Sequence, residues 1–310
     1  MSDIDQQSQA PDKAPDKASD QATARFVRSA ALMVASSALL AGVSLLAKAL
    51  GRGVGGTPLN PMQITAGRFF FAFAVIVLAA LRFRPDFHEP AWGRHVWRTV
   101  LGWLAATCTF AAAARMQLAE ATAISFLSPV ATMALAIPFL RERVGPVRWL
   151  AAAICVAGAF ILIRPGSAAF QPVALIALAS ALLLGMESIL IKKLITSEPP
   201  MRVLLINNGI GVVISIAVAL VVWQPMTGAQ WAMLATLGIA MVCAQFLLLL
   251  AMRGADAAYV APFIYAALIF AALYDVLLFG DWPDAISRVG MGVIVLGGVL
   301  MALRGGPQRN

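Results

Sequence analysis

The sequence predicts an all-α integral membrane protein whose ten transmembrane helices form two inverted five-helix repeats. Of the 310 residues, 61% are hydrophobic and only 12% are charged, about half the charged fraction of a soluble domain. The apolar runs are continuous and not alternating, which indicates helices instead of barrel strands. The two halves of the chain also carry the same ordered set of residues, which indicates a repeat.

Ten apolar runs approach the length of about 20 residues that a helix needs to cross the hydrocarbon core. Residues 203–252 contain no Asp, Glu, Lys or Arg and are too long for one span, so the turn-forming segment 224–228 divides them. The expected spans are residues 29–48, 62–81, 97–115, 119–139, 147–164, 172–191, 203–223, 230–251, 257–279 and 286–303.

The spans divide the chain into two repeats with short tails. Residues 1–28 are expected to be a disordered cytoplasmic tail, because they repeat Ala-Pro-Asp-Lys and contain few large apolar side chains. The first repeat is expected at residues 29–164 and the second at residues 165–304, each with five spans. Residues 305–310 are a second short cytoplasmic tail.

The distribution of Lys and Arg predicts the orientation. Ten spans place both termini on one side of the membrane. If that side is the cytoplasm, 17 of the 23 Lys and Arg residues fall in or near cytoplasmic segments, and six remain elsewhere. This bias follows the positive-inside rule. The sequence therefore predicts a multi-pass protein of a bacterial inner membrane with both termini in the cytoplasm.

Matched residues occur in the same order in both halves. Because each half has an odd number of spans, the second half must be inserted upside down, an arrangement typical of secondary transporters. The matched pairs include Ser36 with Ser180, Leu40 with Leu184, Ser44 with Ser188, Lys48 with Lys192, Arg68 with Asn207, Thr109 with Gln245, Arg141 with Gly280, and Gly158 with Gly297.

Residues 30–304 resemble the drug/metabolite transporter superfamily, and within it the EamA family of ten-helix carriers. The resemblance rests on residues 119–129 and Arg141-Glu142-Arg143 in the first half, and on Val260-Ala261-Pro262-Phe263-Ile264-Tyr265, Phe279-Gly280-Asp281-Trp282-Pro283 and Gly297-Gly298 in the second. The family's usual Gly-Glu after the fourth span is here Arg141-Glu142.

This resemblance implies a permease that moves a small organic metabolite through a central cavity by alternating access. Members similar in the second-half motif include carriers proposed for riboflavin and S-adenosylmethionine, and others export amino acids. An exporter of drugs or toxic metabolites is an alternative within the same family. The implied partners are a small-molecule substrate and the lipid bilayer, and a homodimer is an open alternative for the assembly.

Four polar residues inside spans are candidates for substrate binding: Arg68, Asn207, Asn208 and Gln245. A charged side chain near a helix centre costs about 2.5–3.5 kcal/mol on insertion scales, so each one needs a reason. Arg68 could hold an anionic or carbonyl group of the substrate, or it could extend to the headgroups. The amides could bind a ligand or merely bond to a neighbouring helix.

Two aromatic residues and two carboxylates complete the candidates. Trp103 and Tyr265 lie deep in their spans and would suit a planar ring, although packing alone would also account for them. Glu187 and Asp275 are candidate coupling carboxylates. The alternative is that Glu187 pairs with Lys192 or Lys193, and Asp275 with Arg288.

A polytopic membrane enzyme, such as a lipid or prenyl transferase, is the main alternative outside transport. The sequence has no paired-carboxylate motif, and its two histidines, His88 and His95, fall in one expected loop without metal-ligand spacing. No nucleotide-binding loop or basic aromatic stripe occurs. The sequence therefore predicts no enzymatic activity, no cofactor, no metal and no nucleic-acid partner.

Overall fold

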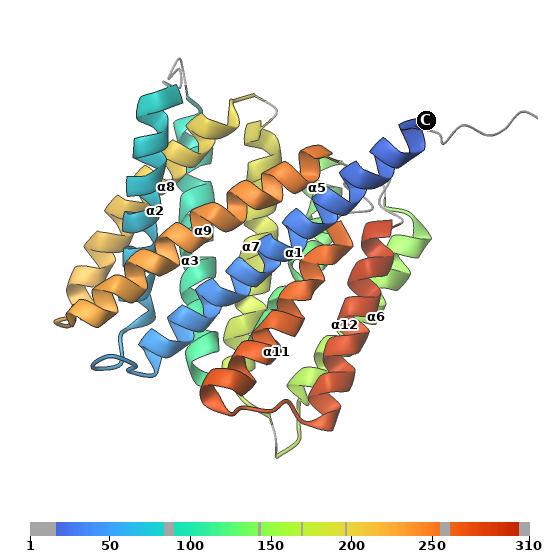
Figure 1. Ribbon diagram of the computed structural model, residues 1–310. Coiled ribbons are helices and arrows are strands. Elements are labelled where there is room, and N and C mark those ends of the chain that lie inside the picture. Colours follow the sequence, from blue (N-terminus) through green and yellow to red (C-terminus); the bar gives the residue numbers. More distant parts are fainter. Residues whose placement is uncertain are drawn as a thin grey trace, which may run out of the picture.

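The computed structural model describes residues 17–83, 90–141, 144–168, 170–195, 197–254 and 261–303, and these ranges contain helices and no strand (Figure 1). The first half contains α1 (Lys17–Gly51), α2 (Pro61–Phe83), α3 (Trp92–Arg115), α4 (Leu118–Ser125), α5 (Ser128–Leu140) and α6 (Pro146–Ile163). The second half contains α7 (Val173–Ile195), α8 (Pro200–Ala219) with η1 (Leu220–Val222), α9 (Gly228–Gly254), η2 (Ala261–Tyr265) with α11 (Ala266–Phe279), and α12 (Ala285–Leu303).

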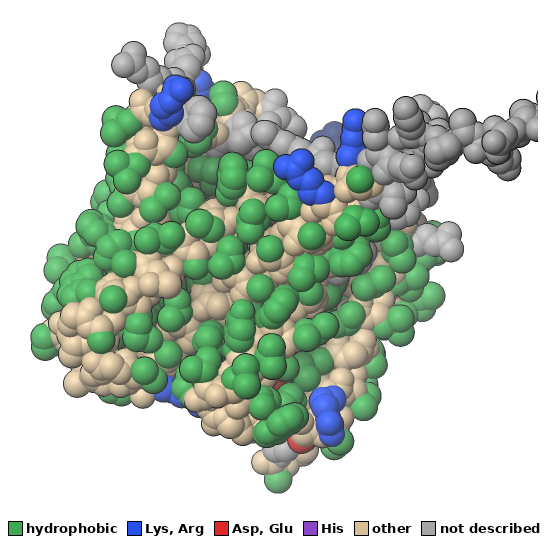
Figure 2. All heavy atoms as spheres, viewed as in Figure 1, with side chains coloured by type: hydrophobic (Ala, Val, Ile, Leu, Met, Phe, Trp, Pro, Cys, Tyr) green, Lys and Arg blue, Asp and Glu red, His purple; other side chains and the backbone are tan. Residues whose placement is uncertain are grey.

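These helices form ten segments within the described ranges, the number of spans that the sequence predicts. Eight are long and apolar enough to span by length and composition, and the apolar helix Phe263–Phe279 is shorter. The remaining segment is α3, which carries Arg94, His95 and Arg98 in its first two turns. Apolar side chains cover the middle of the visible surface, while Lys and Arg lie at its upper and lower edges (Figure 2).

The start of α1 corrects the expected disordered tail. The helix already begins at Lys17, so residues 17–28 are helical, whereas residues 1–16 lie outside the described residues. Segment 18–25 contains three Ala residues, which favour helix, and adding turns to an existing helix avoids the cost of nucleation. At 1.5 Å per residue, 35 residues span about 50 Å. This helix therefore crosses the bundle obliquely (Figure 1).

The fourth and ninth spans are broken, which the sequence analysis did not predict. The fourth separates into α4 and α5 at Phe126 and Leu127, just before Pro129 in the first turn of α5. In the ninth, the 3-10 segment η2 precedes α11, and the expected start at residues 257–260 lies outside the described residues. Proline cannot donate a helical hydrogen bond, which favours a break at such a site. The two breaks meet, with the rings of Phe126 and Tyr265 packed edge to face at 4.9 Å.

Helix packing follows the inverted repeat. The contact of α1 with α9 is matched by that of α7 with α3, and the contact of α5 with α7 by that of α11 with α1. The equivalent helices α2 and α8 pack together, as do α6 and α12 (Figure 1). Hydrogen bonds repeat too: Ser36 donates to the carbonyl of Ala244 on α9, and its counterpart Ser180 bonds to Thr109 on α3. The two halves are therefore related by a pseudo-two-fold axis in the membrane plane.

Glycines allow α6 and α12 to approach closely. A Cβ on Gly158 would lie 2.8 Å from the backbone nitrogen of Ile294, and one on Gly297 would lie 2.8 Å from that of Cys155. Small residues at such crossings bring helix backbones into direct contact in lipid. This pair of equivalent helices consequently joins the two halves at one edge of the bundle.

The helices α5 and α11 end in the same backbone conformation with different residues. Gly280 closes α11 at φ 68°, a left-handed conformation that glycine adopts without strain. The matched residue Arg141 closes α5 at φ 55°. A side chain in this conformation costs about 1–2 kcal/mol, so Arg141 has a structural cost that its counterpart Gly280 avoids.

One end of the bundle is packed more extensively than the other. We call the end where α1 begins and α12 ends the N-face, and the other end the opposite face. The end of α1 packs with the starts of α2 and α9 at the opposite face, in a cluster that includes Leu50, Ile64 and Leu234. At the N-face, Met33 and Ala251 form a smaller cluster in the described residues.

Candidate functional site

A cavity of about 390 Å³ lies between the two halves, in the middle of the bundle. Residues of both repeats line it, on α1–α4 of the first half and on α7, α8, α9 and α11 of the second. Four matched pairs contribute both members to its wall: Leu40 and Leu184, Ser44 and Ser188, Arg68 and Asn207, and Thr109 and Gln245. The pseudo-two-fold axis therefore passes through this cavity.

Arg68 faces the cavity from α2 instead of extending to the headgroups. Its guanidinium carbon lies 4.2 Å from the centre of the Phe69 ring, a cation–π contact. Its buried Nε has no hydrogen-bond partner among the described residues. The group interacts electrostatically with Glu187 and with Arg98. An arginine held this way keeps donors available for a ligand.

Glu187 on α7 forms an ion pair with Arg98 on α3, and both residues line the cavity. The Nε of Arg98 is 3.8 Å from Oε1 of Glu187, and the two side chains are 7% and 15% exposed. Gly102 on α3 makes room for this carboxylate, because a Cβ there would be 2.8 Å from Oε1. The ion pair is therefore long, and it links α3 of the first half to α7 of the second.

The three candidate amides all line the same cavity. Asn207 accepts a hydrogen bond of 3.0 Å from Thr99, and Asn208 donates to the carbonyl of Leu204. No hydrogen bond to the Gln245 side chain occurs within the described part of the chain. Arg68, Asn207 and Gln245 thus share one polar space, as their matched positions in the sequence suggest.

Trp103 and Tyr265 do not belong to the cavity wall, contrary to the sequence-based expectation. The α3 residues that line the cavity are 98, 102, 106, 109 and 110, about one turn apart, and Trp103 is buried outside this set. Tyr265 is 8% exposed and packs over Gly298 of α12. Depth in a span is thus not enough to place a side chain in the cavity, because helix rotation decides which face is inward.

Asp275 is also outside the cavity, and its partner is not Arg288. Oδ1 of Asp275 lies 2.5 Å from Nζ of Lys48, and Oδ2 accepts from the backbone N–H of Leu118. The side chains of Lys48 and Asp275 are 0% and 1% exposed. This buried ion pair binds α1 to α11 at the opposite face, so Asp275 has a structural role here.

Further polar contacts close the opposite face. Asp281 pairs with Lys48 at 3.1 Å and with Arg52 at 3.0 Å. Desolvation alone would raise the pKa of Asp281, but the hydrogen bonds and charges of these two cations outweigh it and hold the pKa below its ordinary value. Gln63 and Gln224 exchange two hydrogen bonds between α2 and the segment after η1.

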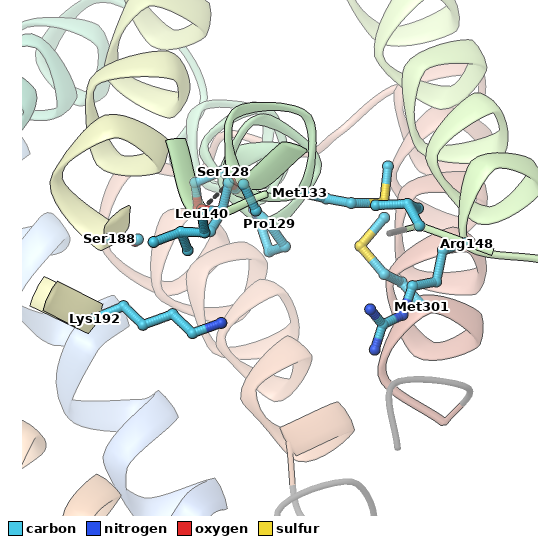
Figure 3. A pocket seen from close by; sticks show the side chains of 11 residues that line it. Ser128, Pro129, Met133, Leu140, Arg148, Ser188, Lys192 and Met301 are labelled. Carbon is cyan, nitrogen blue, oxygen red and sulfur yellow. Dashed lines mark hydrogen bonds between the residues drawn. The ribbon is translucent and has the colours of Figure 1, made fainter. Parts of the chain in front are cut away.

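A second crevice, of about 370 Å³, opens in the N-face half. Ser188 and Lys192 of α7 lie on one side of it, and Arg148 and Met301 lie across from them (Figure 3). Ser188 lines both this crevice and the central cavity. The ion pairs of Lys48 lie at the opposite face, whereas this crevice lies in the N-face half.

The sequence analysis missed two polar groups on α3. It counted Arg98 among the Lys and Arg around the second loop, because Arg98 is only the second residue of the expected span, whereas α3 begins at Trp92 and Arg98 lines the cavity. His95 is buried and bonds to Glu198 at 2.9 Å, while Glu198 also accepts from the N–H of Ala91. Desolvation opposes these bonds, but they hold the pKa of Glu198 below its ordinary value.

A ten-span bundle of inverted repeats around a polar central cavity has the architecture of a secondary transporter. Comparison with known proteins identifies the family: residues 28–164 and 171–303 each match the EamA-like transporter family, and the chain belongs to it. The protein is therefore a multi-pass membrane transporter and not an enzyme, which removes the transferase alternative.

Curated relatives span several substrates. A riboflavin transporter of Rhizobium johnstonii is 36% identical over 70% of each chain. An S-adenosylmethionine uptake transporter of Rickettsia felis is 28% identical over 77% of this chain and 82% of its own. A pseudopaline exporter of Pseudomonas aeruginosa is 26% identical over 64% of this chain and 70% of its own. A crystal structure with 20% identity and a TM-score of 0.60 covers 88% of this chain and 97% of its own, and supports the fold.

Proposed function

We propose that this chain is a carrier for a flat organic metabolite, rich in hydrogen-bond acceptors and either uncharged or anionic, with riboflavin as the leading candidate. The supporting observation is the pair of guanidinium groups, Arg68 and Arg98, in the cavity between the repeats. Guanidinium groups donate several hydrogen bonds in a fixed plane and so favour carbonyl and carboxylate oxygens.

The lining supports this substrate class in two further ways. Its charged residues are two arginines and one glutamate, a net positive charge that favours acceptors over cations. Phe69, Phe110 and Phe126 line the same space, and aromatic faces pack well on a planar ring. The cavity volume lies within the range of about 300–1,000 Å³ typical of small-molecule sites.

S-Adenosylmethionine is the second candidate, and Glu187 is the observation that favours it. A carboxylate in the cavity could bind a cationic amino or sulfonium group. The same cavity would then have to place that cation close to Arg98, which opposes binding electrostatically. For this reason we rank the acceptor-rich substrate first.

Transport would proceed by alternating access. The Lys48–Asp275 pair and its neighbours hold the opposite face closed, while the crevice at Ser188 gives access from the N-face. Rocking of the repeats would break the Lys48–Asp275 contacts at the opposite face and close the crevice at the N-face. We place the protein in a bacterial inner membrane, with the N-face toward the cytoplasm because of its Lys and Arg bias.

A counterflow assay tests the substrate. Vesicles containing the purified protein and loaded with unlabelled riboflavin should take up labelled riboflavin faster than protein-free vesicles. Arg68→Gln should slow this exchange about tenfold or more, since a hydrogen bond to a charged group contributes about 1.5–3 kcal/mol. Gln245→Leu should slow it about fivefold.

Lys193→Gln is the matched control, because Lys193 lies over the Phe139 ring outside the central cavity. The proposal fails if riboflavin shows no counterflow, or if Arg68→Gln behaves like Lys193→Gln. Counterflow of S-adenosylmethionine in place of riboflavin would support the second candidate.

Reporter fusions test the orientation separately. A reporter that works only in the cytoplasm should be active when it is attached after residue 304. Activity of a reporter that works only outside the inner membrane would reverse the assignment of both faces.

A further inference from the structure

We propose that Glu187 is a proton-binding site, and that substrate binding to Arg68 and Arg98 loads it, so that one proton moves with each substrate molecule. This inference rests on the proposed function, since it requires a substrate whose acceptor groups take the arginines. It assigns a coupling ion and its binding group, which the fold and the family membership leave open.

Glu187 is the one carboxylate among the described residues of the cavity wall, which contains no His, Asp, Lys or Tyr. Among the described residues, its charged partners are Arg98 at 3.8 Å and, electrostatically, Arg68. No hydrogen bond to its carboxylate occurs in the part of the chain described here. The charge of this carboxylate thus depends on two arginines that also face the substrate space.

The elements packed around Glu187 supply few other charges. The described helix α5 has no titratable residue, and the titratable residue of α4, Glu120, bonds to Ser287 at the opposite face. On α7 itself, Lys192 and Lys193 lie more than one turn closer to the N-face. Helix α3 contributes Arg98, whereas its residue His95 is hydrogen-bonded to Glu198. Arg68 lies on α2, and the titratable residue of α8, Arg202, interacts with Glu198.

The N-face crevice lies next to this carboxylate in the chain. Ser188, the next residue, lines both the cavity and the N-face crevice. Figure 3 shows the Lys192 and Arg148 side chains extending into that crevice from opposite sides. The Glu187 side chain is 15% exposed, and the proposal takes the N-face crevice as the route by which water supplies its proton.

The loading step exchanges partners. An acceptor oxygen of the substrate takes the N–H donors of Arg68 and Arg98 and draws them from the Glu187 carboxylate. A buried carboxylate that loses its cations is costly, so it accepts a proton from a hydronium ion of the N-face water and becomes a neutral carboxylic acid. One O–H bond forms on Glu187, one O–H bond of hydronium breaks, and water is released.

Substrate and proton therefore bind with positive linkage, which defines symport and not exchange. Each favours the other in the same conformation, and both leave when the cavity opens to the other face. A cationic substrate would produce the reverse linkage, because it would compete with the proton for the same carboxylate. The sign of coupling thus reports which group the substrate contacts.

Accumulation under a pH gradient tests the proposal. With the membrane potential clamped at zero, one pH unit across vesicles containing the wild-type protein should concentrate riboflavin about tenfold on the alkaline side, because one unit corresponds to about 1.36 kcal/mol per proton. Glu187→Gln should show no accumulation, a ratio of about one, at every pH gradient. Asp284→Asn removes a carboxylate that pairs with Arg164 outside the cavity and should keep the tenfold ratio.

The outcomes separate this proposal from the proposed function. Riboflavin counterflow without accumulation in the wild type would overturn the proton site and leave the substrate assignment intact. Tenfold accumulation by Glu187→Gln would also overturn it. Absence of counterflow at equal pH would contradict the proposed function itself.

A second measurement decides the matter if Glu187→Gln does not fold. A pH-sensitive dye should record one proton entering with each riboflavin molecule in wild-type vesicles. Gly102→Ala, whose Cβ would displace the Glu187 carboxylate, should lower that ratio. A ratio of zero in the wild type contradicts the proposal.

Discussion

The ammonium of Lys48 lies 2.5 Å from the carboxylate of Asp275, and neither side chain is accessible to solvent. Lys48 also lies 4.9 Å from the centre of the Phe279 ring. The pair joins the first helix of one repeat to the broken helix of the other at the face that is closed. Lys192, the residue matched to Lys48 in the second repeat, lines the N-face crevice. The two matched lysines therefore have different surroundings at the two faces.

Removing one member of this pair should destabilise the protein strongly. Lys48→Met leaves the Asp275 carboxylate buried without its cation, which costs about 3–5 kcal/mol. Arg52→Met is the control, because the Arg52 side chain is 34% exposed and such pairs contribute about 1 kcal/mol or less. Thermal unfolding of the purified protein in detergent should show a much larger fall for Lys48→Met. Equal melting temperatures for the two variants would show that the buried pair does not form.

Acid should weaken the opposite face through Asp281. The folded-state pKa of Asp281 lies below the unfolded value of about 3.9. The contribution of Asp281 to the free energy of unfolding is therefore complete above the unfolded pKa and is lost as pH falls through the folded pKa. Because Asp281 is 31% exposed, the contribution is about 1 kcal/mol or less. The melting temperature of the wild type should exceed that of Asp281→Asn at pH 6, and the difference should shrink below about pH 4. A difference that grows on acidification would contradict the ion-pair assignment.

Replacing Arg141 by glycine should stabilise the protein. Arg141 has φ 55°, in the left-handed region, where a side chain costs about 1–2 kcal/mol. The entropy cost of glycine offsets about 0.5–1 kcal/mol of that gain. Arg141→Ala removes the same guanidinium but keeps the Cβ, so it should not stabilise. Equal unfolding free energies for Arg141→Gly and Arg141→Ala would argue against backbone strain at this residue.

Gly298 should not tolerate a side chain. A Cβ there would lie 1.8 Å from the hydroxyl oxygen of Tyr265, whose ring is fixed in the core. Overpacking of this kind costs about 1–3 kcal/mol, so Gly298→Ala should lower the melting temperature. Gly292→Ala on the same helix meets nothing within 4 Å and should change it little. A fully stable Gly298→Ala would mean that Tyr265 is free to leave its position.

The number and order of the spans could be predicted from the sequence, because each span contains an apolar run and short polar segments separate the runs. The breaks at Phe126 and at η2 could not be predicted, although a proline lies beside each of them: Pro129 in the first turn of α5 and Pro262 in η2. Proline also occurs inside unbroken helix, as Pro138 does in α5, so its presence does not locate a break without the contacts of neighbouring helices.

Two matched pairs of polar residues in the predicted spans indicated part of the candidate site. Arg68 with Asn207 and Gln245 with Thr109 all reach the cavity. Trp103 and Tyr265 were expected in the cavity wall but lie outside it, because the depth of a residue in a span carries no information about helix rotation. Arg98 was missed because an arginine near an expected span end is indistinguishable from a topology signal until the helix start at Trp92 is known.

The central claim is that the cavity between the repeats binds the transported solute, and cysteine protection at Gln245 tests it most directly. Gln245→Cys, in a protein whose Cys108, Cys155 and Cys243 are replaced by Ala, should react with a hydrophilic maleimide from the N-face. Riboflavin at ten times its dissociation constant should slow that reaction roughly tenfold, and Arg68→Ala should abolish the protection. Ser197→Cys, in the N-face loop between α7 and α8, should react equally with and without riboflavin. An unchanged reaction rate at Gln245→Cys, in vesicles that carry out riboflavin counterflow, would contradict the account.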